Sequence, residues 1–188
     1  MHEMPEPSPS TQSATAPRAF LAGAFIACVG LLTSAGCAGA SFESGIYSDR
    51  FVTYRVGRLD SRWRRVQVED NDLAFHRPHW GTISVNSTCT DYEDVPATAL
   101  LNHLLFETTD RQTSVDEVVA LDGRGAKHVV MSADLDGVPL ELELYILKKD
   151  GCVFDLSQIR SPAAPIATRA AFGEFVKRFR VIAVRNDD

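Results

Sequence analysis

Three Asp-Gly dipeptides, at Asp122-Gly123, Asp136-Gly137 and Asp150-Gly151, constrain the fold of this chain more than any other feature. Aspartate and glycine both tolerate the positive φ angles that two-residue hairpin turns require. The middle dipeptide separates two strand-like segments, residues 129–135 and 138–144. The pattern therefore predicts consecutive antiparallel strands in the second half of the chain.

The central hairpin divides its apolar side chains between two faces of a sheet. If Leu135 pairs with Val138, Val129 shares a face with Leu142, and His128 lies on the opposite face with other apolar residues. Both faces are therefore partly apolar, and each needs a covering layer.

Two segments have the periodicity of amphipathic helices, and four more have the character of strands. Residues 94–105 carry a leucine stripe behind an aspartate that can cap a helix, and residues 171–179 repeat Phe and Val at i, i+3, i+4 and i+7. The strand-like segments are residues 51–56, 63–68, 73–75 and 82–86. We expect an α+β fold in which a central antiparallel sheet of about six to seven strands is covered by helices on both faces.

The first 36 residues have the composition of a targeting segment. A polar leader ends at Arg18, and residues 19–33 form an uncharged apolar run that is too short to span a bilayer comfortably. The run leads into Ser34-Ala35-Gly36-Cys37, which resembles the lipobox of bacterial lipoproteins. This resemblance implies that Cys37 carries a lipid anchor, although Ser34 replaces the more usual Leu and the leader is acidic.

Other ways of processing the chain remain open. Cys28 is a competing lipidation site, but cleavage there leaves a short apolar core. Ordinary secretion with cleavage near Ala38 or Ala40 and an uncleaved anchor are further alternatives. The expected organisation is a leader and signal peptide (1–36), a lipidated tether (37–47), a folded domain (48–183) and a frayed tail (184–188).

Two cysteines remain in the expected domain, Cys89 and Cys152. An even number suits an oxidising compartment, so the two are a candidate disulfide. Closing a loop of this length would stabilise the fold by about 4 kcal/mol if the Cα atoms approach closely enough. The alternative is two separate half-buried thiols.

The order of strands and helices resembles the PsbP-like family, an α/β/α sandwich. The resemblance rests on the strand Asp49–Tyr54, the Trp-led segment Trp63–Val66 and the helix Ala171–Val176, and it spans roughly residues 46–182. It implies an accessory or partner-binding protein without enzymatic activity. It transfers no catalytic residue, and fold-level similarity does not identify a partner.

The segment from His76 to Trp80 is a candidate ligand-binding loop. His76 and His79 flank a turn beside Trp80, and exposed loops often carry function. Two histidines without a clustered third ligand do not make a metal site, so we expect no metal and no cofactor. A surface loop with a packed aromatic ring is the simpler interpretation.

Glu141 and Glu143 form a second candidate, because both fall on the face that carries His128 and Tyr145. A carboxylate pair can perform acid/base chemistry when burial raises one pKa. A wet, uncovered end of the sheet explains the same pattern. The chain contains neither GxSxG nor SxxK, so nucleophilic catalysis has no support.

The net charge of −6 argues against nucleic acid as the main partner, because phosphate binding needs a clustered basic surface. We expect a non-enzymatic binding or assembly module of the cell envelope that holds an envelope protein or a small ligand. Its lipid would place it on the outer membrane, facing the periplasm, since Ala38 is not the Asp associated with inner-membrane retention. An envelope enzyme with a carboxylate site and a passive structural lipoprotein are the alternatives.

Overall fold

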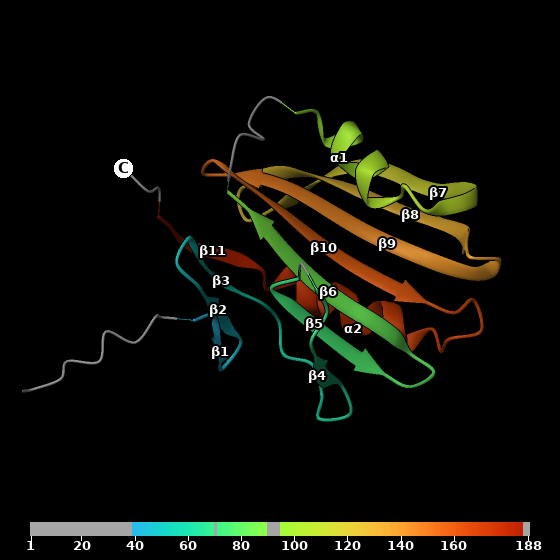
Figure 1. Cartoon of the computed structure of the whole chain (residues 1–188), viewed down its shortest axis with the longest axis horizontal. Helices are drawn as coiled ribbons and strands as arrows, with labels where there is room; N and C mark the ends of the chain where they lie inside the picture. The colour runs from blue at the N-terminus through green and yellow to red at the C-terminus, as the bar shows by residue number, and fades with distance from the viewer. Residues whose placement is uncertain (1–38, 70, 90–94, 186–188) are drawn as a thin grey trace, which may run out of the picture. The chain divides into compact units, whose positions relative to one another are not determined.

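Strands make up most of the computed structural model, which describes residues 39–69, 71–89 and 95–185 within one compact unit, Cys37–Asp188. The elements are β1 (Ser41–Glu43), β2 (Ile46–Ser48), β3 (Val52–Arg55), β4 (Arg64–Val66), β5 (Leu73–Arg77), β6 (Gly81–Thr88), α1 (Ala97–Leu104), β7 (Thr108–Leu121), β8 (Arg124–Leu135), β9 (Val138–Lys149), β10 (Cys152–Arg160), α2 (Ala167–Lys177) and β11 (Arg180–Val184). One sheet has the order β4-β5-β6-β10-β9-β8-β7 and the other has the order β1-β2-β3-β11 (Figure 1).

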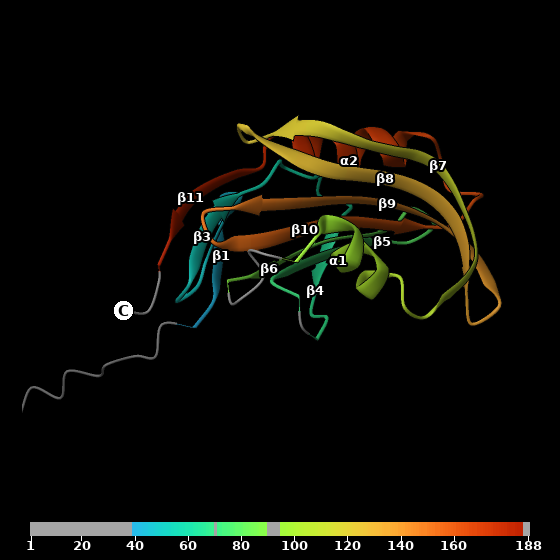
Figure 2. The ribbon, with the colours of Figure 1, turned by 90° about the horizontal axis from the view of Figure 1, so that it is seen from above.

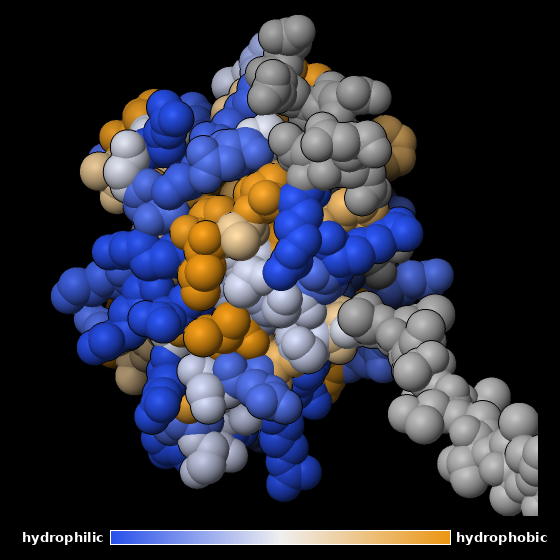
Figure 3. Space-filling view, turned by 90° about the vertical axis from the view of Figure 1, so that its left-hand side faces the viewer, coloured by the Kyte–Doolittle hydropathy of each residue, from blue (hydrophilic) through white to orange (hydrophobic). Residues whose placement is uncertain are grey.

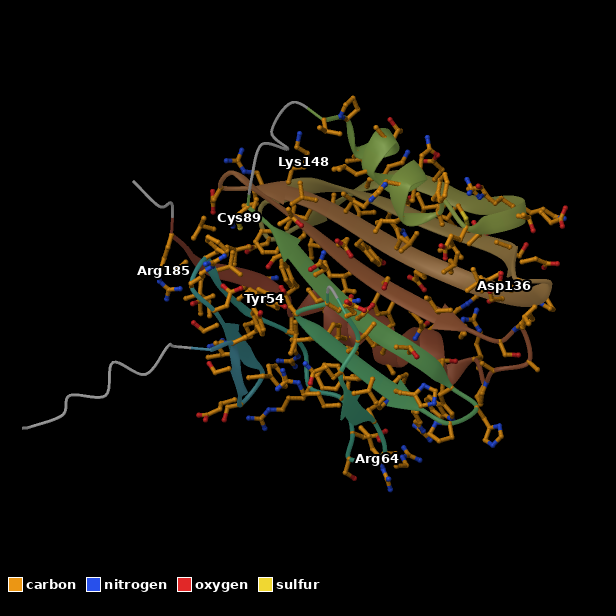
Figure 4. All side chains as sticks on the ribbon, in the orientation of Figure 1. Tyr54, Arg64, Cys89, Asp136, Lys148 and Arg185 are labelled. Atoms are coloured by element: carbon orange, nitrogen blue, oxygen red, sulfur yellow. A yellow bond between two sulfur atoms is a disulfide. The ribbon has the colours of Figure 1, made fainter. Side chains whose placement is uncertain are left out.

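The Asp-Gly pairs form the turns that the sequence predicts. Asp136 and Gly137 have φ angles of 51° and 76°, and the other two pairs adopt the same left-handed conformation. Leu135 pairs with Val138 across this turn, whose tip carries Asp136 at one end of the long strands (Figure 4). The prediction of antiparallel hairpins in this half of the chain is confirmed.

The register also distributes the side chains between the faces as predicted. Val129 pairs with Leu144, and His128 pairs with Tyr145. We call the face that carries Val129 the first face and the face that carries His128 the second face. The side chains of the second face include Phe154 of β10, because Phe154 is two residues from the partner of Tyr145.

The second face is covered jointly by α2 and the four-stranded sheet. Phe172 and Phe175 of α2 are fully buried in the same cluster as Phe154, as is Tyr54 of β3. The rings of Tyr54 and Phe154 meet edge to face, with centroids 6.0 Å apart. Burial of these aromatic rings provides a large share of the hydrophobic stabilisation of the fold.

The expected α/β/α sandwich, with helices on both faces of an α+β fold, is wrong. Over the described residues the protein is mostly β, with sheets of four and seven strands and only two short helices. On the first face, α1 has only eight residues and buries Leu101, with Leu105 directly after it. A second sheet therefore shares with α2 the covering of the second face, which the sequence analysis assigned to a helix alone.

The second sheet contains segments that the sequence analysis placed elsewhere. Residues 41–47, expected to be tether, belong to the β1–β2 hairpin, in which Phe42 pairs with Tyr47. Burial explains this, since Tyr47 is 3% exposed and the ring of Phe42 lies 5.6 Å from that of Phe75. Strand β11 follows α2 and pairs with β3, so the chain is ordered into the region of the expected frayed tail.

The long strands curve around the helix on the first face. Figure 2 shows β7 and β8 bending toward the side on which α1 lies. The β7–β8 ladder shifts register twice, between Thr109 and Gln112 and between Thr113 and Val115. Such bulges bend a strand and increase its twist, so they account for the concave surface at α1.

Cys89, at the end of β6, is joined to Cys152 by a disulfide (Figure 4). The bridge ties the segment before α1 to the start of β10. The leader, the apolar run, Cys28 and Cys37 lie outside the described residues. Within the described ranges, no helix has both the length and the apolar character needed to cross a membrane.

Candidate functional site

The loop from His76 to Trp80 is a packed turn between β5 and β6. The Nδ1 atom of His76 lies 3.1 Å from Oγ1 of Thr82, and His79 is exposed at a φ of 62°. The guanidinium carbon of Arg77 lies 3.2 Å from the centre of the Trp80 ring. Trp80 therefore supports a buried arginine, and the Thr82 hydroxyl already lies within hydrogen-bond distance of His76.

Glu141 and Glu143 lie on the second face, and each is already engaged. Glu141 forms ion pairs with Arg160 and with Arg169 of α2. Glu143 accepts a hydrogen bond from the hydroxyl of Tyr145 at 3.3 Å, and its Oε1 atom lies 3.2 Å from Nε2 of His128. Strand β10 separates these glutamates from the His76–Trp80 turn, so the sequence candidates do not form one site.

No group of three or more potential metal ligands lies close enough together to hold an ion within the part of the chain that the structure describes.

A site that the sequence analysis did not identify lies along α1, on the first face. It consists of two hollows of about 200 and 380 Å³, and both are lined by His103 and Leu104. We call this feature the α1 groove.

One end of the α1 groove is polar. Asp155 of β10 lies opposite Asn86 of β6 in the sheet, and the Asn86 side chain is hydrogen-bonded to the Asp155 carboxyl group. Thr88 and His103 complete this end. Asp155 is thus a carboxyl group on the floor of a hollow whose other walls are Leu100, Leu104, Ile146 and Val153.

The other end of the α1 groove is mostly apolar, although Glu107 and Thr108 also line it. Leu135, Leu140 and Leu142 of the curved strands line it together with Phe106, which follows α1. Phe106 is 82% exposed and Leu104 is 43% exposed, so apolar surface remains open to solvent here. Exposed apolar surface beside a hollow is typical of ligand-binding grooves.

Burial raises the pKa of Asp155 to about 7, and the negative charge of Asp72 adds to this effect, whereas the hydrogen bond from Asn86 opposes it. Near neutral pH the carboxyl group therefore exists in both protonation states. It can donate a hydrogen bond when protonated, and it can pair with a cation when ionised.

Asp72 belongs to a different, structural cluster between the two sheets. It accepts hydrogen bonds from Tyr54 at 3.1 Å, from Ser87 at 2.6 Å and from Tyr47 at 3.4 Å. Burial raises the pKa of Asp72, and the hydrogen bonds from Ser87 and Tyr54 oppose the rise. Because hydroxyl donors surround this carboxyl group, it holds the sheets together and offers no open coordination to a ligand.

No protein-family model matches the chain, and no curated protein sequence matches it. Among solved structures, CyanoP, the PsbP protein of the cyanobacterium Synechocystis, is 12% identical with a TM-score of 0.51, over 82% of this chain and 99% of that one. LpqN of Mycobacterium tuberculosis, described as involved in cell envelope biogenesis, is 12% identical with a TM-score of 0.49, over 70% of this chain and 86% of that one. The likeness to CyanoP supports a PsbP-like fold, and at this identity it concerns the fold alone.

Proposed function

We propose that this protein is a lipid-anchored accessory module of the cell envelope that binds a small amphipathic molecule in the α1 groove and catalyses no reaction. The observation that carries the proposal is the combination of apolar walls with a partly buried carboxyl group, Asp155, at one end of the groove, whereas the other carboxyl group, Glu107, lines the opposite end. Small-molecule sites characteristically combine apolar walls with a small number of polar groups that face the same hollow.

The chemistry of the groove favours an apolar chain with an amine head group. The chain would lie against Leu104 and Leu142 and gain roughly 0.8 kcal/mol for each methylene that it buries. The amine would pair with Asp155 and hydrogen-bond to Thr88. Binding of a cation stabilises the ionised carboxylate, so it would lower the pKa of Asp155 from about 7.

The proposed anchor on Cys37 would hold the domain close to the membrane. Strand β1 begins at Ser41, so the spacer is shorter than the tether of residues 37–47 expected from the sequence. Four residues span at most roughly 14 Å when fully extended. An anchored domain would therefore meet molecules in or beside the lipid surface, where amphipathic ligands are concentrated.

Photolabelling tests the proposal. The full chain in detergent is irradiated with a diazirine-bearing alkylamine, and the labelled peptides are identified by mass spectrometry. We expect labels on α1 and on strands β9 and β10, and excess dodecylamine should suppress them. Leu104→Arg fills the groove with a cation and should reduce the labelling to background.

Ile166→Arg is the matched control, because Ile166 is also an exposed apolar residue, at 75% exposure, and lies before α2. This variant should label like the wild type. Labels that lie elsewhere, or that persist unchanged in Leu104→Arg, would show that the α1 groove is not the binding site.

A further inference from the structure

Another hollow, of about 760 Å³, lies between the four-stranded sheet and the end of α2, and it is rich in arginine. Arg55 comes from β3, Arg58 from the segment after it, and Arg178 follows α2. Ser44 of the β1–β2 turn also lines the hollow. This arginine hollow shares no lining residue with the α1 groove.

The arginines lack acidic partners. Over the ranges that the structure describes, none of Arg55, Arg58 and Arg178 lies within ion-pair distance of a carboxylate. Glu174 lines the same hollow, but its carboxylate lies 3.6 Å from Nζ of Lys177. Three uncompensated positive charges thus converge on one hollow of a protein whose net charge is −6.

A fourth arginine lies beside the arginine hollow. Arg180 of β11 is directly opposite Arg55 in the sheet, and a carboxylate oxygen of Asp122 lies 3.7 Å from its Nε atom. Asp122 therefore offsets the charge of Arg180, and the attraction of the hollow for an anion rests on Arg55, Arg58 and Arg178.

Backbone contacts hold the walls of the arginine hollow in place. The N–H of Val56 donates to the carbonyl oxygen of Gly45 at 2.9 Å, which ties the β1–β2 turn to β3. The N–H of Gly57 donates to the carbonyl oxygen of Phe175 at 2.9 Å, which ties the same segment to α2. Arg55 and Arg58 therefore project from a segment that is fixed on both sides.

We propose that the arginine hollow binds a phosphate group. A guanidinium group presents a planar fork of N–H donors that matches two phosphate oxygens, and three such groups can neutralise a phosphate dianion. The Ser44 hydroxyl supplies a further donor. Phosphate reaches this place either as a soluble phosphate compound or as the head group of an anionic phospholipid, and the chemistry of recognition is the same.

The unfolding midpoint of the full chain in detergent, measured by circular dichroism, tests the proposal with inorganic phosphate as the probe. Potassium chloride at equal ionic strength is the reference. Phosphate at about five times its dissociation constant should raise the midpoint by about 2–4 °C, because it binds only the folded state. The shift should be absent in the double variant Arg58→Ser/Arg178→Ser.

Arg124→Ser is the matched control, since Arg124 is an exposed arginine on β8 that does not line the hollow. It should retain the full shift. The midpoints in chloride show whether each variant folds. If the double variant is folded and shifts as much as the wild type, soluble phosphate does not bind in this hollow.

A second arm identifies the source of the phosphate group. The same midpoint is measured with vesicles of phosphatidylcholine, with or without phosphatidylglycerol. A higher midpoint in the phosphatidylglycerol vesicles that disappears in the double variant assigns a lipid head group, whereas a response to inorganic phosphate alone assigns a soluble compound. If neither probe separates the wild type from the double variant, the proposal is overturned, whatever the outcome for the α1 groove.

Discussion

Replacing Asp155 by asparagine should change how the stability of the protein depends on pH. Burial raises the pKa of this carboxyl group from 3.8 to about 7 in the folded state. The folded protein therefore binds more protons than the unfolded chain between about pH 4 and pH 7, and its stability falls as the pH rises through that window. Asparagine is an isostere of the protonated acid and removes this dependence.

The size of the effect follows from the shift in pKa. Each unit corresponds to 1.36 kcal/mol, so ionising Asp155 in the folded state costs at most about 4 kcal/mol. The free energy of unfolding of Asp155→Asn minus that of the wild type should therefore increase from pH 4 to pH 8 by up to this amount. Urea unfolding followed by circular dichroism at several pH values measures this difference.

Asp136→Asn is the control, because Asp136 is exposed at the tip of a hairpin, where asparagine also adopts a positive φ. Its stability relative to the wild type should stay constant with pH. If the Asp155→Asn and wild-type curves also remained parallel from pH 4 to pH 8, burial would not control the ionisation of Asp155. The chemical argument for an amine in the α1 groove would then lose its basis.

Two further predictions concern the packing of α2 and the anchor. Gly57→Ala should lower the free energy of unfolding by about 3 kcal/mol, because the new Cβ would lie 2.4 Å from a carbonyl oxygen of α2. Gly173→Ala is the control, since its Cβ would meet nothing within 4 Å. This variant should be as stable as the wild type or more stable in the same urea assay. Cys37→Ala should abolish metabolic labelling with palmitate and release the domain from the membrane fraction. Labelling that survives in Cys37→Ala but disappears in Cys28→Ala would move the anchor to Cys28.

The candidate site shows where reasoning from the sequence reached its limit. His76 and Glu141 were chosen for their chemistry, but strand β10 lies between their strands and each already has a partner. One feature of the sequence could have indicated Asp155: it is a lone carboxyl group between Phe154 and Leu156 in a strand rich in apolar residues. Only the position of α1 shows that this carboxyl group lies in a hollow.

The sequence by itself determined the features that depend on neighbouring residues. The Asp-Gly turns set the register of three hairpins, and the period-two alternation then assigned Val129 and His128 to opposite faces. The apolar stripe on α2 was readable for the same reason, because helical periodicity is contained within a few turns. Turn chemistry and periodicity act over short stretches of chain, so a single sequence contains them completely.

The tertiary structure decided which distant segments meet. Strands β3 and β11 are far apart in the sequence. The free energy gained when they pair depends on aromatic residues of both sheets that become buried together. The same encounter brings Arg55 and Arg178 to one hollow. The sequence around Arg55 does not indicate that Arg178 lies nearby, and the sequence around Arg178 does not indicate Arg55. The two residues come together only when α2 packs against the second sheet.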